Sequence, residues 1–155
     1  MFVAENDLIA RHLGGYLVGP IEHIGSTAVP GMVAKPVIDI MAPVLDLESS
    51  RPAIALMEAI GYWYFPYRAD VIHWFCKPSD AVRTHHLHLV PLRSQTWTDR
   101  LAFRDALRAD ALLAREYGDL KRSLAEQFRE DREAYTEAKG AFIQRVLANV
   151  MRGGS

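Results

Sequence analysis

A glycine–serine turn is the first part of the sequence whose residue types could do chemistry. The segment Glu22-His23-Ile24-Gly25-Ser26-Thr27 places two hydroxyl side chains directly behind a glycine. Glycine lets the backbone turn sharply after a strand, and the following hydroxyl and N–H groups can hold phosphate oxygens. The alternative is an ordinary connection from a strand to a helix, in which the hydroxyl groups only cap the helix.

An aspartate follows the turn after a spacer of twelve residues. The segment Lys35-Pro36-Val37-Ile38-Asp39-Ile40-Met41 places one carboxylate in an otherwise apolar strand. An unpaired charge in such a strand is costly, so Asp39 needs a partner such as a metal ion or Lys35. The alternative is a structural ion pair between Asp39 and a nearby arginine.

A histidine pair forms the third candidate group. His86 and His88 are two residues apart in a predicted strand and therefore share one face, whereas His85 points to the other face. Two imidazoles on one face, with a carboxylate from a neighbouring strand, can bind a divalent ion. We therefore predict a site for Mg²⁺ or Mn²⁺, or for Zn²⁺, at Asp39, His86 and His88. The alternative is a neutral, hydrogen-bonded pair at a half-buried sheet surface.

The elements that must position these side chains are strands first and helices later. Apolar periodicity and turn residues predict strands over 16–24, 37–44, 62–67, 71–77 and 85–91, and helices over 6–13 and 51–60. Beyond residue 95, apolar side chains recur every three or four residues, which predicts a packed helical part. We expect a single α+β domain over residues 1–150, with a mixed β-sheet, flanking helices and a helical C-terminal part. Residues 151–155 are predicted to form a loose tail.

Composition narrows the class of protein further. The 155 residues are 50% hydrophobic and 24% charged, which is typical of one globular domain. With 18 basic and 19 acidic residues the net charge is -1, which argues against a non-specific nucleic-acid binder. The single cysteine, Cys76, excludes an intrachain disulfide and a zinc site built from cysteines. The sequence shows no signal-peptide pattern and no apolar run of about 20 residues, so we expect a cytoplasmic protein without membrane contact.

Taken together, these segments resemble the GrpB family, also called UPF0157, of the nucleotidyltransferase superfamily. The superfamily pattern is Gly-Ser, a spacer, and an aspartate in an apolar strand. The closer resemblance lies in residues 23–31 with Lys35-Pro36 and Ile38-Asp39, and in residues 85–90. It continues in residues 101–108, in Glu116-Tyr117 with Leu120-Lys121, and in Tyr135 and Lys139. The matching segments follow the family order and extend over nearly the whole chain.

The resemblance implies a nucleotidyltransferase-like fold and a function. The implied reaction moves a nucleoside monophosphate from a nucleoside triphosphate to an unknown small-molecule or protein acceptor, with Asp39 carrying a divalent ion. Asp39, Lys35 and His88 are then the catalytic candidates. The candidates for nucleotide and phosphate binding are His23, Gly25, Ser26, Thr27, Arg104, Lys121, Tyr135 and Lys139.

Several of these roles have structural alternatives. Arg104 could pair with Asp105 to dock a helix on the sheet, and Tyr135 could belong to the core. Lys121 and Lys139 could lie on an exposed helix face in pairs with glutamates.

The sequence departs from the superfamily pattern at Met41, where a second carboxylate is usual. It also opens almost directly at the first helix, where the family usually has a further stretch with a tryptophan. The loss of the carboxylate favours an alternative to transfer, namely a binding module that holds a nucleotide or other anion without turnover. A third possibility is a metal-dependent hydrolase that uses the Asp/His cluster. Asp39 could also act as a base toward the acceptor.

Overall fold

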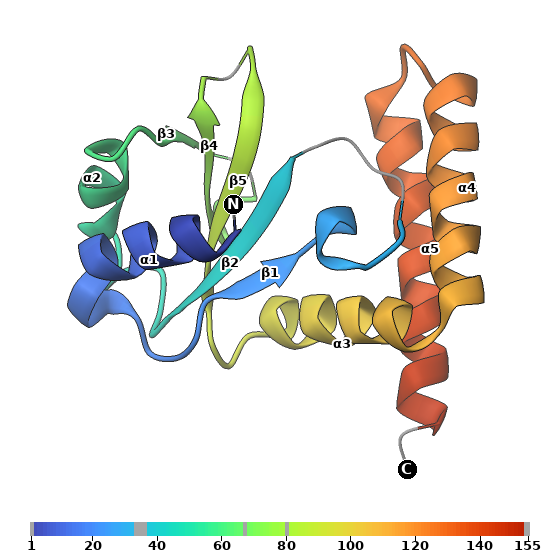
Figure 1. Cartoon of the computed structure of the whole chain (residues 1–155), viewed down its shortest axis with the longest axis horizontal. Helices are drawn as coiled ribbons and strands as arrows, with labels where there is room; N and C mark the ends of the chain where they lie inside the picture. Colours follow the sequence, from blue (N-terminus) through green and yellow to red (C-terminus); the bar gives the residue numbers. More distant parts are fainter. Residues whose placement is uncertain (1, 33–36, 67, 80, 154–155) are drawn as a thin grey trace.

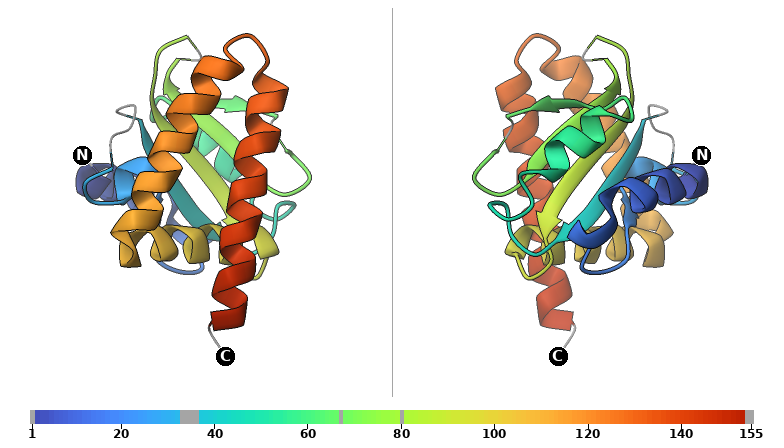
Figure 2. Two further views of the ribbon diagram at one scale, coloured as in Figure 1. Left: turned by 90° about the vertical axis from the view of Figure 1, so that its right-hand side faces the viewer. Right: turned by 90° about the vertical axis from the view of Figure 1, so that its left-hand side faces the viewer.

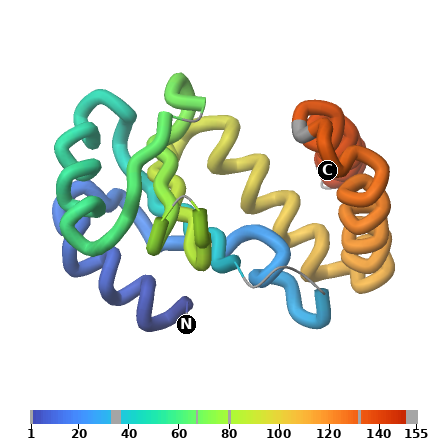
Figure 3. The backbone as a smooth tube through the Cα atoms, turned by 90° about the horizontal axis from the view of Figure 1, so that it is seen from above, coloured from blue at the N-terminus to red at the C-terminus, as the bar shows by residue number. Residues whose placement is uncertain are grey.

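The computed structural model describes residues 2–32, 37–66, 68–79 and 81–153, apart from the side chains of residues 132 and 151–153. The chain forms a five-stranded sheet with helices on both faces (Figure 1). Seen from above, α1 and α2 lie on one side of the sheet, and α3 leads away from its other side to α4 and α5 (Figure 3). The predicted α+β class with a mixed sheet is confirmed.

The order of the strands brings the predicted site residues together. The strands, in spatial order, are β1 (Glu22–Ile24), β2 (Ile38–Val44), β5 (Arg83–Pro91), β4 (His73–Pro78) and β3 (Trp63–Phe65). β2 and β5 are parallel, and the other neighbours are antiparallel. In the β2–β5 register, Asp39 lies opposite His86 and Met41 lies opposite His88.

One face of the sheet is covered by α1 (Phe2–Leu13) and α2 (Ala53–Glu58) (Figure 2). Alternate residues of β2 and β5, such as Ile40 and Leu87, pack there against Ile9 and Met57 in a fully buried core. Because successive strand residues point to opposite faces, this core forces the side chain of Asp39 onto the other face.

The other face carries α3 (Gln95–Ala109) and, beyond it, the hairpin of α4 (Ala111–Gln127) and α5 (Arg132–Gly153) (Figure 2). Ser94 caps α3, since its hydroxyl oxygen accepts a hydrogen bond from the Trp97 N–H at 3.2 Å. Asp110 ends α3 and caps α4 by accepting from the N–H groups of the second and third residues that follow it. Buried Leu107, Tyr117 and Phe142 join the three helices.

The N-terminal part differs from the prediction in two ways. The first helix begins at Phe2 rather than at residue 6, because the Phe2 ring stacks on His23 at 4.7 Å and holds this turn against the sheet. The predicted strand over 16–24 is wrong except for β1. Residues Gly14–Tyr16 form a 3₁₀ turn, and Gly19-Pro20 interrupts any regular pairing.

Two features of the C-terminal half bear on the predictions. α5 continues to Gly153 and therefore runs past residue 150, where we expected a loose tail to begin. Within the described ranges, none of the helices has both the length and the apolar character that a bilayer span requires.

A buried charge cluster fixes α1 to the edge of β4. The Glu5 carboxylate accepts a hydrogen bond from the Tyr62 hydroxyl at 2.7 Å and pairs with the Lys77 ammonium group. Burial opposes ionisation of Glu5, but the hydrogen bonds from Lys77 and Tyr62 outweigh it and lower the pKa of this carboxyl. The cluster therefore depends on the charge of Glu5.

Glu5→Gln should lower the free energy of unfolding by about 3 kcal/mol, because it leaves the Lys77 charge buried without its carboxylate. Urea denaturation at neutral pH measures the change. Glu58→Gln is the control, since Glu58 is exposed on α2 and should change stability by less than about 0.5 kcal/mol. Equal effects of the two substitutions would contradict a role for the cluster in holding α1.

Candidate functional site

The Asp39 carboxylate is the centre of the candidate site. Its Oδ1 atom lies 3.0 Å from His86 Nδ1 and 3.5 Å from His88 Nε2. Both histidines come from β5, the parallel neighbour of β2, and their spacing of two residues puts them on the face of Asp39. The structure therefore brings Asp39 and the histidine pair together on one face of the sheet.

The hydrogen-bond partners define the tautomer of each ring. A carboxylate can only accept, so His86 donates to Asp39 from Nδ1, which leaves the lone pair of a neutral ring on Nε2. That Nε2 atom is buried and has no hydrogen-bond partner among the described residues. His88 receives a hydrogen bond on Nδ1 from Arg100 Nη1 at 2.9 Å and therefore carries its proton on Nε2, facing Asp39.

The electrostatics of the cluster favour a charged Asp39 and a neutral His88. Burial would raise the pKa of Asp39, but the hydrogen bonds from His86 and His88 outweigh it and hold the pKa well below its usual range. Burial lowers the pKa of His88 to about 4, although its hydrogen bond with Asp39 acts in the opposite direction. The site at neutral pH therefore contains one carboxylate and an uncharged His88.

The glycine of the predicted turn is required by the close approach of Asp39. Gly25 has a φ of 77°, in the left-handed region, and directly precedes the 3₁₀ turn η2 (Ser26–Ala28). A Cβ atom at Gly25 would lie 2.6 Å from Asp39 Oδ2, well inside van der Waals contact. The turn therefore packs against one carboxylate oxygen while the histidines bond to the other.

Two predicted phosphate-binding residues, His23 and Thr27, bond to each other. The Thr27 hydroxyl donates to the Val37 carbonyl oxygen at 3.2 Å, so it accepts from His23 Nε2 at 2.9 Å. Burial lowers the pKa of His23, and the nearby Arg108 charge lowers it further. Both side chains therefore stabilise the turn, because their hydrogen bonds connect β1, η2 and the residue that precedes β2.

The helical hairpin brings two predicted lysines to the site. Lys121 of α4 donates to the Ser26 hydroxyl at 2.5 Å, and its ammonium group lies 5.2 Å from the centre of the Tyr117 ring. Lys139 of α5 lies 5.5 Å from the centre of the Tyr135 ring. Burial lowers the pKa of Lys139, and the charge of Asp39 opposes that change, which places this lysine within electrostatic reach of the carboxylate.

A row of arginines on α3 lies along the edge of the site. Arg100 bonds to His88, and Arg108 donates from Nε to the Ala28 carbonyl oxygen at 2.8 Å. The predicted phosphate ligand Arg104 instead bonds to Glu22 at 2.7 Å and to the His23 carbonyl oxygen at 3.1 Å, and it also pairs with Asp105. In this arrangement Arg104 docks α3 on β1.

Arg100 is a site residue that the sequence analysis missed. The three arginines are spaced by four residues, which predicts one helix face, but the spacing alone does not identify what the face contacts. The predicted catalytic residue Lys35 lies outside the described residues. Met41, in place of the usual second carboxylate, is fully buried in an apolar cluster with Ile24 and Trp74.

The donor groups do not suit a resident divalent ion in this arrangement. A histidine that binds a metal through one nitrogen normally donates its other N–H to a carboxylate or carbonyl. His88 Nδ1 faces the donor Arg100, so a metal on Nε2 would require a deprotonated ring. In the described part of the chain, no group of three His, Cys, Asp or Glu side chains is arranged to hold a metal.

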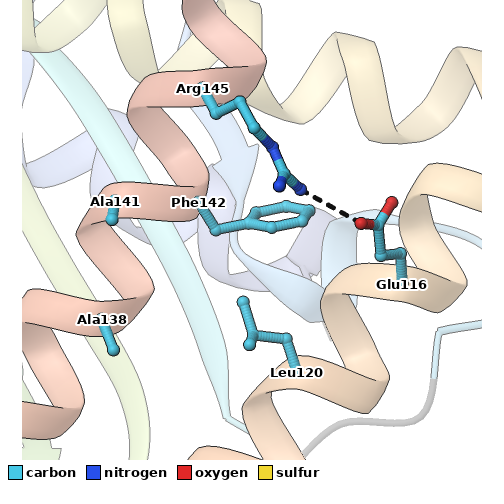
Figure 4. Close-up of a pocket in the computed structure, with 6 residues that line it drawn as sticks. All are labelled: Glu116, Leu120, Ala138, Ala141, Phe142 and Arg145. Atoms are coloured by element: carbon cyan, nitrogen blue, oxygen red, sulfur yellow. Dashed lines mark hydrogen bonds and ion pairs between the residues drawn. The ribbon is translucent and has the colours of Figure 1, made fainter.

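Two surface hollows lie away from Asp39. One, of about 430 Å³, lies between α4 and α5 and is lined by Leu120, Ala138, Ala141 and Phe142. Figure 4 shows it closed on one side by the ion pair of Arg145 with Glu116. The second, of about 530 Å³, lies behind η2 and is lined partly by residues 30–32 and by α4. None of the predicted site residues lines either hollow.

Known proteins match this chain along nearly its whole length. The family model described as GrpB protein matches residues 1–149. A UPF0157 protein of Pseudomonas aeruginosa is 37% identical over 97% of this chain, and the glutamate-rich protein GrpB of Alkalihalophilus pseudofirmus is 33% identical over 95%. The chain spans 62% of the length of the first relative and 87% of the second. The crystal structure of conserved protein GrpB from Enterococcus faecalis superposes with a TM-score of 0.84 at 31% identity, covering 98% of this chain and 91% of that one.

A left-handed backbone costs an alanine residue about 1–2 kcal/mol. Gly25→Ala should destabilise the protein by more than this, because the new methyl group would also collide with Asp39. Gly31→Ala is the matched control, since Gly31 has a φ of 78° and a Cβ there meets nothing within 4 Å. Thermal and urea unfolding measure both variants. In an Asp39→Ala background the extra cost of Gly25→Ala should become smaller but not vanish, because the Cβ atom of residue 39 still lies 3.1 Å from the new methyl group, and an unchanged difference would contradict the contact with the carboxylate.

The stability of the protein should decrease as the pH falls from about 7 to about 4.5. His88 takes up a proton near pH 6.5 when unfolded but only near pH 4 when folded, so its contribution is complete above pH 6.5 and is lost on acidification. The loss amounts to about 2 kcal/mol over this interval. His88→Gln should remove that part of the pH dependence, measured by urea denaturation. His12→Gln, on the exposed face of α1, should retain it.

Proposed function

The chain belongs to the GrpB family, and on that premise we propose that it transfers a nucleoside monophosphate from a nucleoside triphosphate to an acceptor hydroxyl or amine at the Asp39 site. The observation that carries the proposal is the state of His86. Its ring is fixed by Asp39 through Nδ1, and the lone pair on Nε2 is buried without a partner among the described residues. A buried polar atom without a partner is unusual in proteins, and an acceptor O–H or N–H that displaced the side chains covering Nε2 would satisfy it.

Cationic side chains around the carboxylate suit the triphosphate. Lys121 donates to the Ser26 hydroxyl. It therefore lies beside the glycine–serine turn that would bind the β- and γ-phosphate oxygens. Lys139 adds a second ammonium group within the electrostatic range of Asp39. A divalent ion that arrives with the nucleotide belongs to the substrate and reduces the phosphate charge further.

The chemical step needs a base, a leaving group and compensation of charge. The acceptor oxygen or nitrogen attacks the α-phosphorus, the bond from that phosphorus to the bridging oxygen breaks, and pyrophosphate leaves. The proton of the acceptor moves to His86 Nε2, and Asp39 stabilises the imidazolium ion that forms. Lys121 and Lys139 offset the negative charge that develops on the leaving group.

Asp39 supports the base rather than replacing it. Its Oδ1 atom accepts from both histidines, its Oδ2 atom packs against Gly25, and its pKa lies well below the usual range. A carboxylate so placed is a weak base but a good partner for a positively charged ring. Burial lowers the pKa of His88 and keeps the ring neutral, and Arg100, which donates to Nδ1, directs the Nε2–H group to Asp39, which keeps the carboxylate in place.

A binding module without turnover is the second candidate function. It is favoured by Met41, a buried residue that occupies the position where the superfamily usually has its second carboxylate. Such a module would use the same lysines and the same turn, but it would not need the lone pair of His86. The two functions therefore predict different effects of one substitution at this position.

His86→Asn should abolish transfer and preserve triphosphate binding. Asparagine can keep an N–H group near Asp39 in place of Nδ1 but has no atom in place of Nε2, so only the base is removed. Loss of a general base lowers the rate by roughly 10²–10⁴-fold. Incubation of the protein with α-labelled triphosphates and a metabolite and protein extract, followed by separation of labelled products, measures transfer. Calorimetry measures binding.

His12→Asn is the control and should change neither measurement, because His12 lies on the far side of the sheet in α1. Binding of a triphosphate with no labelled product from the wild-type protein would favour the binding module. Absence of triphosphate binding would contradict both functions.

A further inference from the structure

We propose that the hollow behind the glycine–serine turn is a second anion site, which binds a phosphate or carboxylate group attached to an apolar body. The hollow has a volume of about 530 Å³ and lies between residues 30–32, the end of α3 and the part of α4 from Ala111 to Arg122. Small-molecule sites in proteins occupy about 300–1,000 Å³, so the hollow has the size of such a site. The transfer reaction proposed above does not depend on it.

The lining of the hollow separates into a charged rim and an apolar floor. Arg108, Arg115 and Arg122 contribute guanidinium groups, and Met32, Leu107 and Ala114 contribute apolar surface. Asp119 also lines the hollow, but it pairs with Arg122. The remaining charge is therefore positive, and guanidinium groups bind phosphate and carboxylate oxygens in pairs.

The arginines differ in how much of their bonding capacity is used. Arg108 donates from Nε to the Ala28 carbonyl oxygen, which orients its terminal amino groups. Within the part of the chain that the structure describes, the Arg115 side chain forms neither an ion pair nor a hydrogen bond. An anion in the hollow would be a partner for Arg115. It would also bind Arg108, whose Nε–H group bonds to the turn that packs on Asp39.

Two glycines leave space in the hollow. Gly118 lies in the middle of α4, where glycine weakens a helix relative to alanine, and a Cβ atom there would meet nothing within 4 Å. Gly31 on the opposite wall also has nothing within 4 Å of its Cβ position. A long side chain at position 118 would therefore enter the hollow without a clash at its Cβ atom. This provides a way to close the site while every arginine stays in place.

Titration of the protein with 1-naphthyl phosphate tests the proposal, because this probe joins a phosphate to an apolar ring. We expect saturable shifts of the Gly31 and Gly118 amide resonances in NMR spectra, and weaker binding of 1-naphthol and of inorganic phosphate. Arg115→Gln should weaken the binding of the probe about tenfold or more, because one charge-assisted hydrogen bond is lost. Gly118→Leu should prevent binding.

The controls separate the hollow from general effects of charge and stability. Arg11→Gln removes an exposed arginine from α1, and Gly118→Ala changes the helix without filling the hollow; both should bind the probe like the wild type. The proposal is overturned if the probe does not bind saturably, or if Arg115→Gln and Gly118→Leu bind it normally. Triphosphate binding should survive Gly118→Leu, so failure here and failure of the transfer function give different results.

Discussion

The structure depends on the need to satisfy one carboxylate in a central strand. Asp39 lies in β2 between Ile24 of β1 and His86 of β5, with 26% of its side chain exposed. A carboxylate in such a position is unfavourable without hydrogen-bond donors. The parallel pairing of β2 with β5 supplies them, because it places two imidazole N–H groups beside Oδ1. The sheet order, the histidine spacing and the absence of a side chain at Gly25 together meet this requirement.

The donors at Asp39 are imidazole N–H groups and not arginine or lysine side chains, and this choice affects the charge of the whole site. Had arginine or lysine satisfied the carboxylate, the local charge would have been cancelled. Instead the rings share the proton-donating role, and the cations serve other contacts, with Arg100 on His88 and Lys121 on Ser26. Around one carboxylate the site therefore gathers positive charge from three helices. In the transfer that we propose, this arrangement attracts the anionic triphosphate and leaves the His86 ring to accept the proton.

The sequence predicted the position of a side chain correctly where that position follows from local periodicity. The period of two in a strand placed His86 and His88 on one face, and the apolar run of β2 indicated that Asp39 needs a partner. The early start of α1 was not predictable in this way, because it depends on Phe2 stacking on a ring 21 residues later. The partners of Arg100 and Arg104 depend on how α3 crosses the sheet, which no local pattern contains. Likewise, the proton positions on the histidines follow from partners on other elements.

Met41 shows why the superfamily spacing alone does not decide the chemistry. Its side chain emerges on the face of Asp39 but is fully buried against Ile24 and Trp74. A carboxylate in its place would lose its hydration without gaining a donor, so a two-carboxylate metal centre is incompatible with this packing. The histidine strand supplies what remains possible at such a site, namely a fixed ring with a basic nitrogen beside a charged aspartate. The fold that this chain shares with the GrpB family thus leaves the reaction to be argued from the site itself. For the transfer that we propose, the site supplies a histidine as proton acceptor in place of a second metal-binding carboxylate.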